Sequence, residues 1–455
     1  MDFGASLKYL YSLGHEVLAA KLGLDSISML LEKLGRPDRS FKSLIVAGTN
    51  GKGSVAAMID SIARAAGHHC ALLTSPHLVR IQERMRVNGR EIAEADFARL
   101  ASTVREASEA LVGDGEMDAP PTFFEQITAI ALCYFRECAA ELAVLEVGLG
   151  GRLDATNAVD RIASVVTTID FDHQNLLGNT IEEIAGEKAA IIVPGTRAVI
   201  GRQQREAANE VLMRRCLETG VLPVFVNQPT AVGTSDFGHV TFDYESCRAN
   251  YARIMPGLRG RHQADNAGAA IEAAELLNDA GLPLSRVEII KGLREVSWPG
   301  RLELIDDRPR ILLDGAHNPA GARALRAYLD EFWSGPITLL FGAMSDKDVD
   351  GMAAELFDAA RTVVLTRVRD ARAPSAARAS LTRVRDARAA DGARLGKSAL
   401  NSSRNVIFTE TVRQALSWAR SVTPPDGLVC VAGSLHLVGE VKRLFDEANS
   451  QTAVI

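Results

Sequence analysis

The chain has 455 residues, of which 47% are hydrophobic and 24% are charged, a balance typical of folded globular proteins that excludes a largely disordered chain. Its formal net charge of −6 argues against a dedicated nucleic-acid-binding protein, because such proteins are normally basic. No apolar run approaches the roughly 18 residues that a membrane-spanning helix needs, and residues 1–4 lack the basic start of a signal peptide. The length predicts two or three domains.

The six cysteines are scattered along the chain and form no CxxC pair: Cys70, Cys133, Cys138, Cys216, Cys247 and Cys430. In a chain of this size such a distribution indicates reduced, buried thiols rather than a disulfide framework or a zinc site. The cysteines therefore predict a cytoplasmic protein.

Short apolar segments alternate with segments of helical spacing in the first two thirds of the chain. We expect strands at residues 43–47, 70–74, 142–147 and 163–168, and helices at 55–66, 121–134, 181–191, 266–277 and 286–293. This alternation predicts a mainly parallel sheet wrapped by helices.

The alternation restarts after Pro299 and Gly300, a pair that suits a linker. We expect strands at residues 311–313, 337–341, 362–365, 406–408 and 428–432, and helices at 321–332, 352–360 and 411–420. The predicted fold class is therefore α/β, with a P-loop-containing N-terminal domain and a smaller, Rossmann-like C-terminal domain. The predicted limits are 1–295 for the first domain, 296–301 for the linker and 302–455 for the second.

A tandem duplication interrupts the second domain. The nine-residue sequence LTRVRDARA occurs at residues 365–373 and again at 381–389. Only one copy can continue the strand that begins at Thr362. We interpret the remainder of the basic segment 365–396 as a solvated loop rather than a binding element.

A glycine-rich segment follows the first predicted strand. Residues 48–54 read GTNGKGS and lead directly into a helix. Glycines let the backbone wrap closely around phosphates, and the helix N-terminus adds partial positive charge. Lys52 can reach the outer phosphates and Ser54 can approach magnesium. The loop is shorter than the usual P-loop pattern, so a structural turn is the alternative, but the flanking strand and helix favour nucleotide binding.

Several motifs, taken together, resemble a known family. In chain order they are GTNGKGS (48–54), TSPHL (74–78), FFEQIT (123–128), LEVGLGGRLDATN (145–157), DH (172–173), GEKA (186–189), HQADN (262–266), PGR (299–301), DGAHNP (314–319) and AGS (432–434). This order is similar to that of the folylpolyglutamate synthases and dihydrofolate synthases of the Mur ligase superfamily. The resemblance extends from about residue 22 to residue 438.

The resemblance implies an ATP-dependent ligase. A folate or dihydropteroate carboxylate would take the γ-phosphate of ATP to form an acyl phosphate, which the amine of L-glutamate then attacks. Members add the first glutamate to dihydropteroate, extend the γ-linked tail of folates, or do both. Lys21 stands where bifunctional members often carry an acidic residue, so we keep both the bifunctional and the purely folate-extending enzyme as predictions.

The resemblance also implies roles for residues that bind ATP and metal. The ATP-binding residues would be Asn50, Gly51, Lys52, Gly53, Ser54, Asn266, Arg301 and Asp314. Ser75, Glu146 and His173 would contact magnesium, with two ions expected and a monovalent cation as a further cofactor that the resemblance allows. Lys188 would be carbamylated, although an ordinary surface lysine paired along its helix is the alternative. Lys188, His173 and His317 are the predicted catalytic residues.

The substrate residues are assigned in the same way. The pterin or folate would contact Leu22, Gly23, Thr122, Phe123, Phe124, Glu125, Leu153, Asp154 and Ala155. The sequence alone favours core packing for the two phenylalanines, and the resemblance shifts them toward the substrate. His317 and Ser434 would bind glutamate, with an ordinary helix cap as the alternative for Ser434.

Three other functions compete with this prediction. A cell-wall Mur ligase would keep the fold, but FFEQIT and the Leu-Gly-Leu segment at residues 22–24 argue against it. A P-loop switch without ligase activity and a non-catalytic nucleotide-binding scaffold are the rivals from other classes. The predicted partners are small molecules alone, with no nucleic acid and no membrane, and the resemblance implies a monomer.

Overall fold

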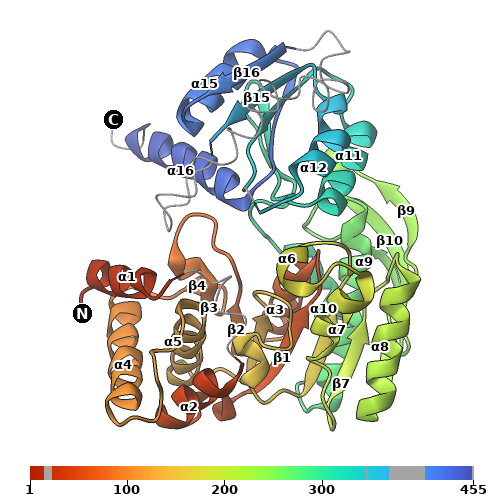
Figure 1. Cartoon of the computed structure of the whole chain (residues 1–455). Helices are drawn as coiled ribbons and strands as arrows, with labels where there is room; N and C mark the ends of the chain where they lie inside the picture. The colour runs from red at the N-terminus through yellow and green to blue at the C-terminus, as the bar shows by residue number, and fades with distance from the viewer. Residues whose placement is uncertain (15–22, 345, 368–404, 453–455) are drawn as a thin grey trace. The chain divides into compact units, whose positions relative to one another are not determined.

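The computed structural model describes residues 1–14, 23–344, 346–367 and 405–452. The chain divides into two compact units (Figure 1). The first comprises Met1–Gly233, Val240–Gly257 and Gln263–Ser297, and the second comprises Thr234–His239, Leu258–His262 and Trp298–Ile455. The domain limits that we expect from the sequence stay a prediction.

An eight-stranded sheet forms the centre of the first unit. Its strand order is β4 (Arg90–Glu91), β3 (Met85–Val87), β2 (Cys70–Leu73), β5 (Leu142–Glu146), β1 (Lys42–Ala47), β6 (Ala163–Val166), β7 (Arg197–Ile200) and β8 (Pro223–Phe225). Every pair from β2 to β8 is parallel, whereas β3 runs antiparallel to both of its neighbours. The mainly parallel sheet expected from the alternating pattern is confirmed.

Helices pack around this sheet. They are α1 (Phe3–Ser12), α2 (Asp25–Lys33), α3 (Lys52–Ala65), α4 (Glu94–Gly113), α5 (Phe123–Glu137), α6 (Gln174–Leu177), α7 (Ile181–Ala189), α8 (Glu206–Thr219), α9 (His262–Asp279) and α10 (Arg286–Glu295). Helices α3 and α10 approach closely because Gly292 has no side chain where it meets the backbone of Ile62. The Ser61 hydroxyl donates to the Gly292 carbonyl at 2.8 Å and fixes this crossing.

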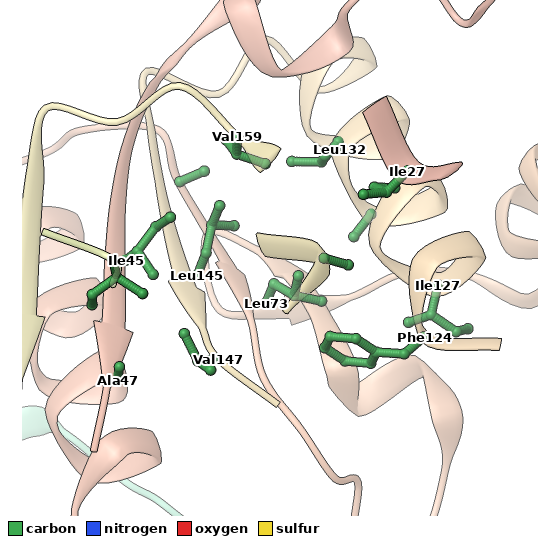
Figure 2. Close-up of a cluster of buried hydrophobic side chains, with 14 of the residues drawn as sticks. Ile27, Ile45, Ala47, Leu73, Phe124, Ile127, Leu132, Leu145, Val147 and Val159 are labelled. Atoms are coloured by element: carbon green, nitrogen blue, oxygen red, sulfur yellow. The ribbon is translucent and has the colours of Figure 1, made fainter. Parts of the chain in front are cut away.

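The hydrophobic core of the first unit lies between the sheet and α5. Figure 2 shows Ile45, Leu73 and Leu145 of the central strands together with Phe124 and Ile127 of α5. Such continuous apolar strands are expected where helices cover both faces of a parallel sheet. This packing places the start of α5 beside the ends of β2 and β5.

A three-stranded sheet, not expected from the sequence, completes this part of the chain. Its order is β11 (Asn250–Ile254), β10 (Val240–Glu245) and β9 (Thr230–Thr234), with β10 and β11 antiparallel. Two tyrosines tie it to α9: the Tyr244 hydroxyl donates to Glu272 at 2.8 Å, and the Tyr251 hydroxyl donates to Glu275 at 2.9 Å.

The second unit contains a six-stranded sheet. Its order is β12 (Glu303–Ile305), β13 (Arg310–Leu313), β17 (Leu428–Ala432), β14 (Ile337–Phe341), β15 (Thr362–Thr366) and β16 (Asn405–Thr409), and all pairs except β12–β13 are parallel. Its helices are α11 (Pro319–Phe332), α12 (Val349–Leu356), α15 (Val412–Val422) and α16 (Leu435–Thr452). The smaller α/β unit expected from the sequence is confirmed.

Several helix ends in this unit differ from expectation, including the start of α12 at Val349 and the end of α15 at Val422. Helix α11 starts two residues early because Pro319 suits a first helical position and the Asn318 side chain caps the helix. Helix α12 ends at Leu356, and a 3₁₀ turn at Phe357–Ala359 replaces the rest of the expected helix. The first copy of the duplicated sequence begins within β15, whereas residues 368–404, which include the second copy, lie outside the described residues.

The prediction of reduced, buried cysteines is confirmed only in part. All six are free thiols, and Cys70, Cys133, Cys216 and Cys430 are buried. The prediction of burial is wrong for Cys138, which is half-buried, and for Cys247, which lies exposed after β10. Within the described part of the chain, no helix combines the length and the apolar character needed to cross a membrane.

Candidate active site

The glycine-rich loop at residues 48–54 connects β1 to α3. Gly51 caps α3 with φ of +88°, a backbone conformation that glycine adopts without strain. Residues after β6 hold the loop: the Thr49 N–H donates to the Thr168 carbonyl at 2.9 Å, and the Thr167 hydroxyl donates to the Asn50 carbonyl at 2.8 Å. The loop is thus held in place at the carboxyl end of the parallel strands.

Lysine 52 folds back over this loop. Lys52 Nζ donates to the carbonyl oxygens of Gly48 and Thr49, each at 3.1 Å. Its charge therefore lies beside the start of α3, where the helix dipole also favours an anion. Together, these features can bind a phosphate group.

Helix α9 approaches the loop from another side. A Cβ added to Gly51 would lie 2.5 Å from Asn266 Oδ1, so this carboxamide packs directly against the loop. Ser54 and Gln263 are both buried, and Gln263 Nε2 donates to Ser54 Oγ at 3.5 Å. The structure thus brings together predicted ATP residues that are more than 200 positions apart.

Two of the predicted metal residues, Ser75 and Glu146, lie at the carboxyl ends of the neighbouring strands β2 and β5, whereas His173 stands seven residues after β6. Glu146 ends β5 and is 5% exposed, and its carboxylate accepts the Ser75 N–H at 3.1 Å. His173 caps the short helix α6 with φ of +49°, and its backbone N–H donates to the Asp172 carboxylate at 2.9 Å. Ser75 and Glu146 are therefore in contact through the Ser75 backbone, and their role as metal ligands stays a prediction.

Lys188 is buried within α7, with 4% of its surface exposed. The alternative of an ordinary surface lysine is therefore wrong. The loop after β5 packs on this part of α7, since a Cβ on Gly151 would lie 2.7 Å from the Glu187 carbonyl and 3.2 Å from Lys188 Cα. Arg152 reinforces the contact through its 2.9 Å ion pair with Glu187.

Two predicted pterin residues meet at Gly148. A Cβ on Gly148 would lie 2.9 Å from the Phe124 ring and 3.3 Å from Asp154 Oδ2. The Asp154 carboxylate accepts the N–H groups of Gly148, Leu149 and Thr156 at 2.9–3.0 Å. Burial raises the pKa of Asp154, and these hydrogen bonds oppose that shift.

The start of α5 is a capping box. The Thr122 N–H donates to the Glu125 carboxylate at 2.8 Å, and the Glu125 N–H donates to the Thr122 hydroxyl at 3.4 Å. Phe123 is 2% exposed and stacks on Tyr11 with the ring centroids 5.5 Å apart. Both phenylalanines thus pack in the core, as the sequence alone favours, and the substrate contacts that the resemblance implies for them stay a prediction.

The remaining pterin residues differ in exposure. Ala155 is buried, Leu153 is 37% exposed, and Gly23 is half-buried with φ of +92°. Leu22 lies outside the described residues.

The second unit holds four predicted residues at adjacent strand ends. After β13, the Asp314 carboxylate accepts the N–H groups of Leu302 and Ala316, each at 2.9 Å. Arg301 packs on Gly315, where a side chain would collide with its guanidinium. His317 Nδ1 donates to the Gly315 carbonyl at 2.8 Å.

Ser434 follows β17 in the same unit. Its hydroxyl accepts the His436 N–H at 3.1 Å at the start of α16, so the cap that competed with glutamate binding is present.

Sequence analysis assigned no role to two buried polar side chains that contact predicted site residues of the first unit. Arg84 is fully buried, its Nε donates to His77 Nδ1 at 2.9 Å, and its guanidinium lies 5.5 Å from the Phe123 ring centroid. Gln263 is 1% exposed beside Ser54. The signal was present, because His77 and Gln263 both stand within recognised motifs.

Two family models match most of the chain. The Mur ligase middle domain matches residues 46–274, and the Mur ligase glutamate ligase domain matches residues 300–435.

Named relatives agree with these matches. A Bacillus subtilis dihydrofolate synthase/folylpolyglutamate synthase is 37% identical over 75% of this chain and 80% of its own length. A probable bifunctional folylpolyglutamate synthase/dihydropteroate synthase of Haloferax volcanii is 35% identical over 98% of this chain, which spans only 51% of that relative's length.

Solved structures share the fold over nearly the whole chain. Mycobacterium tuberculosis folylpolyglutamate synthase complexed with ADP has a TM-score of 0.85 and 31% identity, covering 98% of this chain and 99% of its own. Escherichia coli FolC in complex with DHPP and ADP has a TM-score of 0.83 and 28% identity, covering 99% of each chain.

Proposed function

Because this chain belongs to the folylpolyglutamate synthase/dihydrofolate synthase family of Mur ligases, we propose that it is an ATP-dependent ligase that adds L-glutamate to folates and to dihydropteroate. The γ-phosphate of ATP passes to the substrate carboxylate, and ADP leaves. The amine of glutamate then attacks the acyl phosphate carbon, the new amide bond forms, and phosphate leaves. The observation that carries this proposal is the fixed loop at residues 48–54 with Lys52 folded over it.

The chain's residues divide this work. In the first unit, residues 50–54 and Asn266 bind the nucleotide. The residues beside Gly148, Phe124 and Asp154, bind the pterin. In the second unit, Arg301 and Asp314 are the proposed ATP residues, and His317 and Ser434 are the proposed glutamate residues. A forked guanidinium suits phosphate oxygens, which supports the role of Arg301.

Magnesium fits the residues at the end of β5. Glu146 offers a carboxylate and Ser75 a hydroxyl, which are the hard oxygen ligands that this ion prefers, and His173 is the third proposed ligand. When bound, magnesium neutralises phosphate charge during the transfer. A second ion and a monovalent cation belong to the same proposal.

One assay tests the function. The purified protein is incubated with ATP, magnesium and glutamate, and offered dihydropteroate or tetrahydrofolate separately, with the products identified by mass. We expect one added glutamate per ADP formed with both substrates. A product with tetrahydrofolate alone would indicate the purely folate-extending enzyme. ATP hydrolysis that needs neither folate nor glutamate would contradict the ligase and favour a nucleotide switch.

Carbamylation of Lys188 is a separate part of the proposal. Lys188 is buried, and carbamylation requires the neutral amine. Its nitrogen would bond to the carbon of carbon dioxide and release a proton, and the carbamate would orient magnesium. We expect K188A to lose about 100-fold or more in kcat, as when one preorganised electrostatic contact is removed, and bicarbonate should not restore it. K291A, at an exposed lysine of α10, is the control. Full activity of K188A would rule out this role.

The predictions of a monomer and of a cytoplasmic location are part of this proposal. Gel filtration at the concentration of the assay checks the first.

A further inference from the structure

Gln263 lies in the first turn of α9 and is only 1% exposed. A buried amide needs hydrogen-bond partners, because each unsatisfied group costs about 1–3 kcal/mol. Gln263 Oε1 accepts from Asn266 Nδ2 at 2.9 Å. The two residues are three positions apart and therefore share one face of the helix. This bond fixes the plane of the Asn266 carboxamide.

The fixed carboxamide lies against the phosphate loop. Asn266 Oδ1 is 2.5 Å from the position that a Cβ of Gly51 would occupy, and Gly51 has φ of +88°. Any side chain at this position would therefore collide with Asn266. With Nδ2 held by Gln263, the oxygen of Asn266 faces the loop, and its orientation is set before a nucleotide arrives.

The other end of Gln263 reaches Ser54. Gln263 Nε2 donates to Ser54 Oγ at 3.5 Å, and Ser54 is 2% exposed. A serine hydroxyl oxygen accepts through two lone pairs. The amide of Gln263 takes one of them, and the other remains for a cation or a further donor. One side chain thus orients polar groups of both α9 and α3.

We propose that Gln263 is a positioning residue, which holds the Asn266 carboxamide and the Ser54 hydroxyl in the orientation that binds ATP. This inference rests on the proposed function and extends it to a residue that touches neither substrate nor metal. Preorganisation of this kind strengthens binding because the groups need no reordering when the ligand enters.

The test is Q263M, which keeps the length of the side chain and removes its hydrogen bonds to Asn266 and Ser54. We expect KM for ATP to rise about fivefold to tenfold, the effect of one to two lost hydrogen bonds, while kcat changes by less than about twofold. In N266A the same substitution should raise KM for ATP less than it does in the wild-type protein, because the part of its effect that acts through Asn266 is already lost and only the part that acts through Ser54 remains. An unchanged KM for ATP, or fully additive losses in the double variant, would overturn the proposal.

The matched control is N278L on the last turn of α9. Asn278 also uses its amide, which donates to the Leu284 carbonyl at 3.1 Å, but it binds only the following loop. N278L should lower the melting temperature and leave KM for ATP unchanged. If Q263M does not fold, a crystal structure of the wild-type protein with Mg·ADP decides, because a Gln263 that contacts neither Ser54 nor Asn266 would contradict the proposal. Failure of the wild-type protein to ligate glutamate would instead reject the proposed function.

Discussion

Gly148 follows β5 by two residues and separates two side chains that we propose to bind the pterin. A methyl group on it would lie 2.9 Å from the Phe124 ring and 3.3 Å from the Asp154 carboxylate. Insertion of a methyl group into a packed site costs about 1–3 kcal/mol. We expect G148A to raise KM for the folate substrate about tenfold and to leave KM for ATP unchanged.

Steady-state kinetics with each substrate varied in turn measures this effect. The control is G113A at the end of α4, where a Cβ would meet nothing within 4 Å. It should leave both KM values unchanged and stabilise the protein by up to about 1 kcal/mol. If G148A bound folate normally, Phe124 and Asp154 would not form the pterin site.

At the scale of single residues, the sequence indicated which residues match the family's motifs but not what each side chain contacts. The motif order identified Glu146 and Ser75, which the structure brings into contact. It did not predict that Thr122 caps α5, although the spacing of Thr122 and Glu125 is that of a capping box. It could not predict that Lys188 is buried, because burial depends on distant segments. Gln263 received no role for the same reason.

The contact between the three-stranded sheet and α9 depends on two buried glutamates. Glu272 and Glu275 are 1% and 3% exposed, and they accept hydrogen bonds from Tyr244, Tyr251 and Ser246. Within the described part of the chain, neither carboxylate forms an ion pair with a cationic side chain. Burial raises the pKa of Glu272, and the Tyr244 hydrogen bond opposes this shift.

The raised pKa of Glu272 predicts how stability depends on pH. A carboxyl group whose pKa is raised by folding stabilises the protein fully below the unfolded value, about 4.3 for glutamate. That stability is lost as the pH rises through the folded-state pKa, and the loss is about 1.4 kcal/mol for every tenfold difference between the two acid dissociation constants. E272Q stays neutral and can still accept from Tyr244, so it should lose less stability than the wild-type protein between pH 5 and pH 8.

Urea unfolding at several pH values measures this difference in the free energy of unfolding. E245Q removes an exposed carboxylate from the neighbouring strand β10 and should follow the wild-type curve. Parallel pH profiles of E272Q and the wild-type protein would show that Glu272 is ionised in the folded state throughout this range.

At the scale of elements, apolar runs predicted most of the buried strands but missed β7, which is buried at three of its four positions. Strands such as β5 are buried at every position, which produces a clear signal. Strand β11 is mostly exposed and β8 has only three residues, so neither stands out from a loop in the sequence. Helix α8 was also missed, although its buried residues Ala208, Val211, Leu212 and Cys216 follow helical spacing.

At the scale of the whole molecule, the two α/β units were predictable because the alternation of strands and helices restarts after residue 300. The assignment of Thr234–His239 to the second unit could not be predicted, because it depends on contacts between residues far apart in the sequence. One of these is the hydrogen bond that the Tyr328 hydroxyl donates to the Phe237 carbonyl at 2.8 Å. The proposed ATP residues belong to both units, so nucleotide binding should affect the stability of each.

Tryptophan fluorescence measures the thermal stability of the second unit alone, because all three tryptophans belong to that unit. They are Trp298, Trp333 and Trp418. A ligand at 100 times its Kd stabilises the state that binds it by about 2.7 kcal/mol. For a unit of this size that corresponds to a rise in melting temperature of about 5–10 °C. We expect Mg·ADP to raise the tryptophan-detected melting temperature accordingly.

Substitution of Arg301 tests whether that rise in melting temperature arises from direct contact of the second unit with the nucleotide. In R301A the shift should fall by more than half, whereas R308A, at an exposed arginine of the same unit, should keep it. Nucleotide affinity measured by calorimetry in parallel allows both variants to be compared at equal saturation. A full shift in R301A at that saturation would mean that the second unit is stabilised only through the first, and that Arg301 does not bind the nucleotide.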